Sequence, residues 1–180
     1  MYPTRLDAKT VVLREFTNDD AGPLAKIYGD PDATRHLSFE PKDETQIEQI
    51  IGAAINAAKT EPRSEYMLAV ADPASDELIG VGRLALGEHQ SGQIGFALRP
   101  DQWGSGKGTE TVALLQRLGF RALGLHRIWG ARSPLNEVSA RTMLAAGMIE
   151  EGTMRGHLFT RGAWRDSIVH SILSDEYLPV

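Results

Sequence analysis

Apolar residues recur along this chain with two spacings: every second residue in some stretches, and every third or fourth in others. A spacing of two predicts a strand with one buried face, whereas a spacing near 3.6 predicts an amphipathic helix. Clusters of glycine, proline and aspartate separate these stretches. The stretches that predict strands are 10–16, 66–71, 78–86, 93–98, 126–132, 150–159 and 166–173.

The helical spacing occurs four times. The second occurrence follows Asp43, whose position three residues before Gln46 is typical of a capping box. Gly124 and Gly147 follow the last two apolar patterns, where glycine commonly ends a helix. The predicted helices lie behind 17–20, between 43 and 61, over 109–123 and over 135–146.

The order of these elements predicts the fold class. Three successive strands joined by the short turns 72–76 and 87–92 indicate antiparallel pairing. The passage from the strand at 93–98 through a helix to the strand at 126–132 adds one parallel pair. The chain contains no repeat, low-complexity tract or linker. We therefore expect residues 1–180 to form a single α/β domain, with a mixed, mainly antiparallel central sheet and helices on both faces.

Composition narrows the class of protein. The hydrophobic fraction of 42% and the charged fraction of 24% are ordinary for a globular protein. A formal net charge of -5 disfavours non-specific binding to nucleic acid. The N-terminus lacks the apolar core of a signal peptide, and the longest apolar patch, at 50–58, is too short to cross a bilayer. These features predict a cytoplasmic protein without membrane or nucleic-acid partners.

Cysteine and histidine usage excludes some chemistry. The chain has no cysteine, and hence no disulfide, thiolate ligand or cysteine nucleophile. Its histidines show no metal-ligand spacing such as H-x-x-x-H, so no metal site is expected. The histidine positions are 36, 89, 126, 157 and 170.

The stretch 103–109 is the strongest candidate for a binding site. Gly104, Gly106 and Gly108 alternate within five residues, directly before a predicted helix. Glycine allows a ligand to approach the main chain closely. The first turn of a helix offers unpaired N–H groups and a partial positive charge. This combination predicts a phosphate-binding loop.

One class of protein with such a loop is the nucleotide kinase. Gly106-Lys107 would be the Gly-Lys pair of the Walker A pattern G-x-x-x-x-G-K-S/T. The first glycine of that pattern would then fall on Asp101, and Gly108 stands where Ser or Thr is required, so that Thr109 would have to serve. The preceding strand also belongs to an antiparallel run. The kinase therefore stays a remote alternative.

A second class fits more of the chain. The strand at 94–98, the segment 99–102 and the loop 103–108 before a helix resemble the acetyl-CoA motif of the GNAT N-acetyltransferase superfamily. The family loop is Q/R-x-x-G-x-G/A, and Trp103 departs from it at the first place. Features similar to the ribosomal-protein (RimJ/RimL-like) branch are Trp103, Thr109-Glu110, Asn136-Glu137-Val138-Ser139 and Glu151-Gly152 with Arg155 and 162–166.

The resemblance implies a GNAT acyltransferase fold and acetyl-CoA as the co-substrate. The pyrophosphate would bind the backbone N–H groups of the loop, and the pantetheine arm would pair with an exposed strand edge. A bulge near Gly95 would open that edge. A backbone N–H there would also polarise the thioester carbonyl. The expected coenzyme-binding residues are Phe96, Leu98, Trp103, Gly104, Ser105, Gly106, Lys107, Gly108, Thr109 and Asn136.

N-acetyl transfer by direct attack needs a proton acceptor for the amine and a proton donor for the leaving thiolate. The resemblance implies that Ser139 protonates the leaving thiolate or donates a hydrogen bond to it. The branch often has an acidic base before Ile-Gly, where this chain has Gln93. His157 is the expected replacement because its ordinary pKa suits base catalysis. His36, Glu40 and Glu65 are further options, as is a chain of water molecules.

The acceptor is the least defined partner. The family usually shapes the acceptor pocket with the segment 30–42, which here offers Arg35 for a carboxylate, Glu40 for a cationic amine, and His36. The predicted acceptor is a primary amine, either a protein N-terminus or a small molecule, and a homodimer is common in the family. The alternative is a non-catalytic acyl-CoA-binding protein on the same fold, which the missing acid at Gln93 keeps open.

Overall fold

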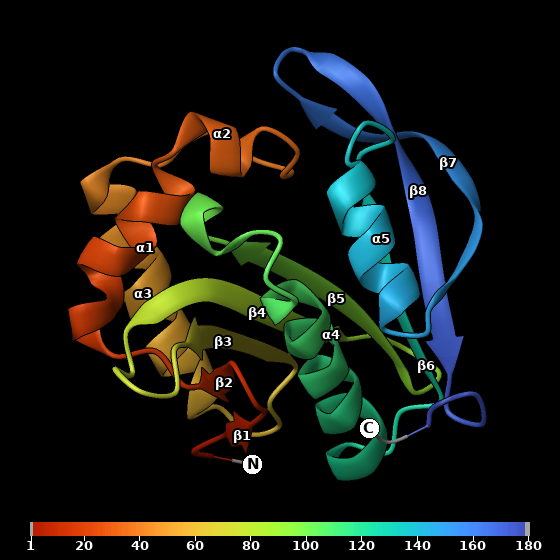
Figure 1. The fold of residues 1–180 in the computed structure, drawn as a ribbon, viewed down its shortest axis with the longest axis horizontal. Helices are drawn as coiled ribbons and strands as arrows, with labels where there is room; N and C mark the ends of the chain where they lie inside the picture. The colour runs from red at the N-terminus through yellow and green to blue at the C-terminus, as the bar shows by residue number, and fades with distance from the viewer. Residues whose placement is uncertain (1, 179–180) are drawn as a thin grey trace.

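The computed structural model describes residues 2–178, which form a single eight-stranded sheet of order β1-β2-β3-β4-β5-β6-β8-β7 (Figure 1). Neighbouring strands are antiparallel except β5 and β6, which are parallel. The strands are β1 (Arg5–Asp7), β2 (Val12–Arg14), β3 (Glu65–Ala71), β4 (Leu78–Leu86), β5 (Ser91–Leu98), β6 (Arg127–Arg132), β7 (Ile149–Thr160) and β8 (Ala163–Leu173).

The α-helices of the described residues are α1 (Ala21–Tyr28), α2 (Pro31–Thr34), α3 (Glu44–Ala58), α4 (Lys107–Arg117) and α5 (Glu137–Ala145). Short 3-10 turns precede α1 at Asn18–Asp20 and α4 at Pro100–Gln102. The capping box predicted for α3 is present, since the Asp43 carboxylate accepts a hydrogen bond from Gln46 N at 2.8 Å. A π-helical turn, Leu118–Ala122, extends α4 towards Gly124.

The mixed, mainly antiparallel sheet predicted from the sequence is confirmed, and two short elements were not predicted. They are β1 and α2, of three and four residues. Asp30, Pro31 and Asp32 are residue types typical of a turn that ends a helix. Instead, the Asp30 carboxylate accepts hydrogen bonds from the backbone N–H groups of Asp32 and Ala33, both at 2.8 Å, and caps α2. A residue type that favours turns also starts helices, so the sequence alone did not separate the two outcomes.

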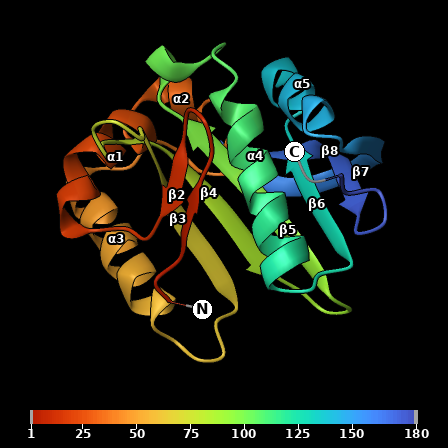
Figure 2. The ribbon, with the colours of Figure 1, turned by 60° about the horizontal axis from the view of Figure 1, so that its bottom comes forward.

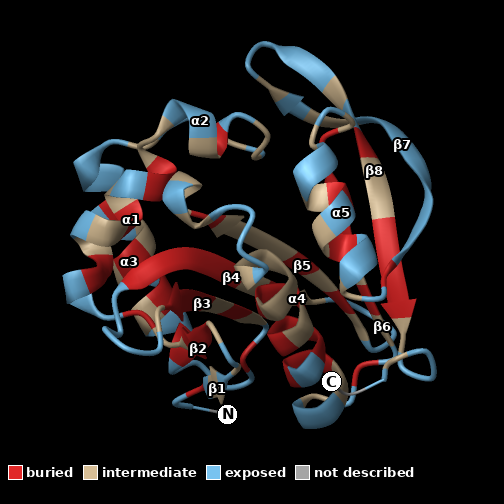
Figure 3. Cartoon of the chain, in the orientation of Figure 1, coloured by how far each residue is buried: buried red, intermediate tan, exposed pale blue. Residues whose placement is uncertain are grey.

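Helices cover both faces of the sheet, as expected (Figure 2). On one face α1 and α3 bury Leu24, Ile27 and Ile47 against strands β3 and β4. On the other face α4 buries Val112 and Leu115 against β2 to β5, and α5 adds Met143. Burial is concentrated in the central strands, whereas β7 and the tip of the β7–β8 hairpin are largely exposed (Figure 3).

The separation of β5 from β6 positions the candidate site. The two strands pair in register only from Ser91 to Ile94 of β5. The rest of β5, from Gly95 to Leu98, has no strand partner on that side. The expected bulge near Gly95 is wrong, because β4 and β5 pair one to one through Gly95, which lies opposite Arg83. The edge opens because β6 turns away to pair with β8 alone beyond Gly130.

The packing of α4 gives a stability prediction. Leu115 has no exposed surface and lies within the core beneath α4. We expect Leu115→Ala to lower the free energy of unfolding by about 3 kcal/mol, because it leaves a cavity under the helix. The matched change Leu144→Ala, at a side chain that is 50% exposed, should cost less than about 1 kcal/mol. Urea denaturation measures both, and equal losses would contradict this description of the core.

Candidate active site

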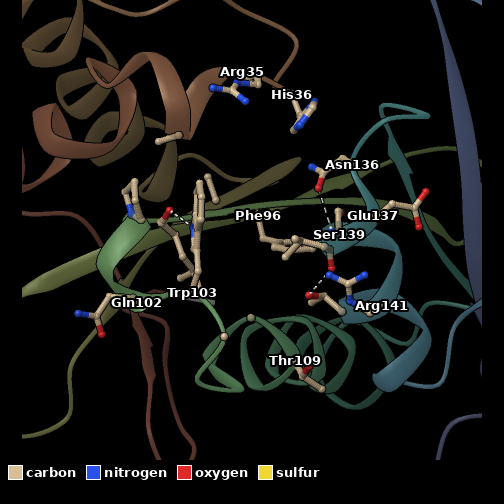
Figure 4. Close-up of a pocket in the computed structure, with 18 of the residues that line it drawn as sticks. Arg35, His36, Phe96, Gln102, Trp103, Thr109, Asn136, Glu137, Ser139 and Arg141 are labelled. Carbon is tan, nitrogen blue, oxygen red and sulfur yellow. Dashed lines mark hydrogen bonds between the residues drawn. The ribbon is translucent and has the colours of Figure 1, made fainter.

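A cleft of about 870 Å³ lies where β5 and β6 separate (Figure 4). Its floor is the open end of β5, and the loop before α4 and the first turn of α5 form two walls. The segment from Asp32 to Leu37 closes the remaining side. The structure thus brings together four segments that are far apart in the sequence, and most of the predicted site residues lie on them.

The open edge of β5 presents backbone groups to the cleft. Arg99 N donates to Ile79 O of β4 at 2.9 Å, so the backbone groups of Arg99 and of every second residue before it face β4. Because successive residues of a strand direct their backbone groups to opposite sides, Phe96 and Leu98 face the open side. Trp103 Nε1 donates to Leu98 O at 2.9 Å, which fixes the indole against this edge. Phe96 and Leu98 therefore lie where the sequence predicted them.

The glycine loop forms a backbone cradle at the start of α4. Gly104 and Gly106 have φ of 72° and 81°, in the left-handed region that favours glycine. Gly106 is the N-cap of α4 and has no side chain to accept from the first-turn N–H groups. The nearby Glu110 carboxylate does not cap the helix either, because it accepts from Thr10 N at 2.8 Å. The first turn of α4 therefore directs uncapped N–H groups at the cleft.

The polar side chains around the loop bond to one another. Ser105 Oγ donates to Gln102 O at 2.6 Å, and Lys107 Nζ donates to Gln102 Oε1 at 2.5 Å. Lys107 Nζ is also 3.9 Å from Asp72 Oδ2, in the turn between β3 and β4. Ser105 and Lys107 do not line the cleft, in contrast to Gly104, Gly106, Gly108, Thr109 and Trp103.

Asp101 is engaged by Arg99. Hydrogen bonds from the Arg99 guanidinium hold the pKa of the Asp101 carboxyl at about 2. Arg99 in turn also bonds Glu77 at 2.8 Å. The carboxylate therefore carries its charge at neutral pH, beside a guanidinium that balances it.

The first turn of α5 supplies Asn136 and Ser139. Asn136 Oδ1 accepts from Ser139 N at 3.0 Å and caps the helix (Figure 4). This leaves the amide nitrogen of Asn136 for a ligand. Ser139 lines the cleft, and within residues 2–178 its hydroxyl makes no hydrogen bond back to a helix carbonyl. Thr142, one turn further on, does bond Val138 O at 2.9 Å.

Arg141 is a cleft residue that the sequence analysis missed. Its side chain lies below Ser139 in Figure 4 and lines the cleft. It forms no ion pair within the described part of the chain, and its guanidinium is exposed. The one feature of the sequence that could have indicated Arg141 is its place two residues after Ser139 on the same short helix. A charged side chain on a helix is common, and nothing in the sequence separated Arg141 from the others.

Arg35 and His36 form the opposite wall, across from Asn136 and Ser139 (Figure 4). The Arg35 guanidinium is paired with Asp32, one turn earlier. Burial lowers the pKa of His36, and the charges of Arg35, Arg165 and Arg161 lower it further. His36 is therefore predominantly neutral at pH 7, since its pKa lies below the ordinary value of about 6.5.

Several residues proposed from the sequence lie outside the cleft. His157 is on β7, half-buried, and does not line the cleft. Glu40 is exposed and also absent from the cleft lining. Gln93 lies opposite Ala85 of β4 and Trp129 of β6, before the strands separate. Glu65 is paired with Arg83. Of the residues considered as a base, the structure thus brings only His36 to the cleft.

The described residues hold neither a cluster of metal ligands nor a helix that could span a membrane. Within residues 2–178, no group of three or more histidine, aspartate or glutamate side chains could hold a metal ion. None of the helices over that same range has the length and apolar character needed to cross a membrane.

Comparison with known proteins identifies the family. Residues 10–149 match the family described as the acetyltransferase (GNAT) domain. The uncharacterized N-acetyltransferase YoaA of Bacillus subtilis is 30% identical over 176 residues, which cover 96% of this chain and 98% of YoaA. The ribosomal protein uS5-alanine N-acetyltransferase of Escherichia coli is a more distant relative, 25% identical over 97% of this chain and 93% of its own length.

Solved structures show the same fold. A GNAT-family acetyltransferase from Bacillus anthracis superposes with a TM-score of 0.84 at 20% identity, over 96% of this chain and 99% of its own. The spermidine N-acetyltransferase of Vibrio cholerae, solved with CoA and spermine, superposes with a TM-score of 0.79 at 21% identity, over 93% and 98%. At such identities the likeness concerns the fold alone.

The chain belongs to the GNAT acetyltransferase family and is an N-acetyltransferase. Members of this family use acetyl-CoA. The nucleotide-kinase alternative is therefore wrong, as the mismatched Asp101 and Gly108 had indicated. Family membership also sets aside the non-catalytic alternative that Gln93 had kept open.

The backbone cradle gives a binding prediction. Gly106→Val should weaken acetyl-CoA binding at least about tenfold, because a β-branched residue is strongly disfavoured at φ 81° and would distort the start of α4. Lys107→Ala should change the dissociation constant less than about threefold, since its ammonium bonds Gln102 rather than the cleft. Isothermal titration calorimetry measures both.

The control is Gly52→Val in α3, where an added Cβ meets nothing within 4 Å. It should leave acetyl-CoA binding unchanged. If Gly106→Val binds like the wild type, the loop is not the coenzyme cradle.

Proposed function

We propose that this protein transfers the acetyl group of acetyl-CoA to a primary amine by direct attack within a ternary complex. We take residues 1–180 as one catalytic domain. The observation that carries the proposal is the continuity of the cleft. It runs from the uncapped N–H groups of α4, along the open edge of β5, to His36 on the far wall.

The polar groups of the coenzyme match the groups that line the cleft in order. Pyrophosphate would accept hydrogen bonds from the N–H groups of the loop 104–109, aided by the partial positive charge of the helix N-terminus. The pantetheine amides would pair with the backbone of Phe96 and Leu98, as peptides pair with a sheet edge. The Asn136 amide nitrogen would donate to the same arm. Arg141 adds a positive charge on this side of the cleft, which suits a phosphate.

In the reaction, the amine nitrogen attacks the thioester carbonyl carbon, and the carbon–sulfur bond breaks as the tetrahedral intermediate collapses. A backbone N–H of the open β5 edge would stabilise the developing oxyanion. Ser139 would donate a hydrogen bond or, with a water, a proton to the departing thiolate. The amine loses one proton and the thiolate gains one, so the proton balance closes.

We assign the proton acceptor to His36 rather than to His157. His36 lies in the cleft and is neutral at pH 7, whereas His157 is outside it. A neutral imidazole can accept a proton from the substrate ammonium, which frees the amine for attack, or the proton that the nitrogen of the tetrahedral intermediate loses.

The acceptors of relatives give two possibilities for the substrate. One relative is named for alanine acetylation of a ribosomal protein, and a structural neighbour is named for spermidine. Both are primary amines, so both agree with the proposed chemistry. Assembly into a homodimer stays a prediction from the family resemblance.

An assay of CoA release tests the proposed function. Incubation of the protein with acetyl-CoA and a panel of peptides and small amines should release free thiol only where an amine acceptor is present. Ser139→Ala should lower kcat by about 10- to 100-fold while acetyl-CoA still binds, since the change removes a proton donor from the transition state. Thiol release that is independent of any amine, or tight binding of acetyl-CoA with no turnover on the whole panel, would contradict the proposal.

The assignment of the base predicts a pH dependence. The rate should rise with pH through the lowered pKa of His36, because only the neutral imidazole accepts a proton, and this limb should lie below about pH 6.5. His36→Gln should remove the limb and lower kcat at pH 7 by about 100-fold.

His157→Gln separates the two histidines, and His89→Gln, at a fully solvated turn, is the matched control. Both should keep the wild-type profile. If His157→Gln loses the acidic limb while His36→Gln keeps the wild-type profile, the base is His157 on β7 and not His36.

A further inference from the structure

Two arginines of the β7–β8 hairpin reach across the molecule to the acceptor wall. Arg161 Nη2 donates to Thr34 O at 3.2 Å. Arg165 Nη1 donates to His36 O at 3.0 Å and to Leu37 O at 3.3 Å. The hairpin therefore holds the segment that carries Arg35 and His36, although hairpin and segment are about 130 residues apart in sequence. Both guanidinium groups end beside His36, whose pKa they help to lower.

Within the described part of the chain, several arginines of the fold are paired with carboxylates, but Arg161 and Arg165 are not. Arg14, Arg63 and Arg99 each bond a carboxylate. Within residues 2–178, Arg161 and Arg165 form no ion pair, and the buried Nε of Arg165 has no hydrogen-bond partner. Burial and the charge of Arg161 lower the pKa of Arg165. Positive charge is thus gathered here without a paired carboxylate among the described residues, and for the half-buried Arg165 the lost hydration has a cost that a nearby negative charge would offset, whereas Arg161 is exposed to solvent.

Carboxylates at this end of the cleft do not balance that charge. Asp32 is engaged by Arg35, and Glu40 is outside the cleft. Glu137 lines the cleft, but it lies on the opposite wall, in α5 (Figure 4). Arg161 and Arg165 do not line the cleft themselves, but they lie directly behind the wall that carries Arg35 and His36. A polyamine at this wall would bring its additional ammonium groups towards their positive charge, and like charges repel.

We propose that the acceptor is an amine that carries an anionic group near its reactive nitrogen, that Arg35 binds that group, and that Arg161 and Arg165 add positive charge behind the cleft wall. The proposal rests on the proposed function and deepens it by naming a substrate class. The shared chemistry is a primary amine with a carboxylate on the same or the following residue. An acidic protein N-terminus and a small amino acid both supply it.

Binding to the enzyme–CoA complex tests this proposal without requiring turnover. The protein is saturated with CoA and titrated by calorimetry with Ala-Glu-Glu amide, Ala-Lys-Lys amide, glutamate and spermidine. We expect Ala-Glu-Glu amide, glutamate or both to bind at least about tenfold more tightly than the two cationic probes. Which of the two acidic probes binds distinguishes a protein N-terminus from a small molecule.

Charge reversal supplies the second arm. Arg35→Glu should abolish or reverse the preference, because it places a carboxylate on the acceptor wall. Arg161→Gln should reduce the preference and leaves the exposed surface otherwise similar. The matched control is Arg121→Glu, which makes the same charge change in the π-helical turn at the far end of α4, outside the cleft. This variant should keep the wild-type preference.

Equal binding of acidic and cationic probes, tighter binding of spermidine, or no binding of either acidic probe would overturn the proposal. So would an unchanged preference in Arg35→Glu. These outcomes are separate from failure of the proposed function, which shows in the CoA-release assay as binding without turnover.

Discussion

The arrangement of the whole site depends on one constraint, the loss of pairing between β5 and β6 after Ile94. Up to that point the strands are close, and a Cβ on Gly130 would lie 3.2 Å from the Ile94 side chain. Beyond it, β6 pairs only with β8, and β5 keeps only β4. The helix between them must start at the opening, so its N–H groups face the same space as the free edge. The backbone cradle at the glycine loop and the free strand edge are therefore consequences of one topological feature.

Charge is distributed differently at the two ends of the cleft. Around the glycine loop, side-chain charges are balanced: Arg99 bonds Asp101 and Glu77, and Lys107 Nζ lies 3.9 Å from Asp72 Oδ2. The loop is left to act through backbone N–H groups, which suit a diphosphate without fixing its identity. At the acceptor end, Arg161 and Arg165 bond backbone carbonyls and keep their charge. A net charge of -5 for the whole chain thus says little about the partner, because recognition depends on the local groups.

The sequence predicted the sheet class, the parallel pair, the α3 capping box and the glycine loop because each depends on local periodicity or on one turn. It did not separate His36 from His157, because that choice depends on where distant segments meet. The β7–β8 pairing shifts register between Met154 and Leu158, so no alternation rule fixes the direction of His157. Arg141 was missed for the same reason: only the approach of α5 to the open β5 edge brings it to the cleft.

The contacts between the hairpin and the α2 segment separate specificity from coenzyme binding. The proposed acceptor wall is a short helix and a loop, held by side chains of a hairpin whose tip is largely exposed. Neither part contributes to the glycine loop or to the edge of β5. Substitutions in 32–37 or in the hairpin can therefore change the charge presented to the amine while the donor site keeps its geometry. This division explains why the donor was readable from a local motif, whereas the proposed class of acceptor depends on contacts between the segment 34–37 and the β7–β8 hairpin.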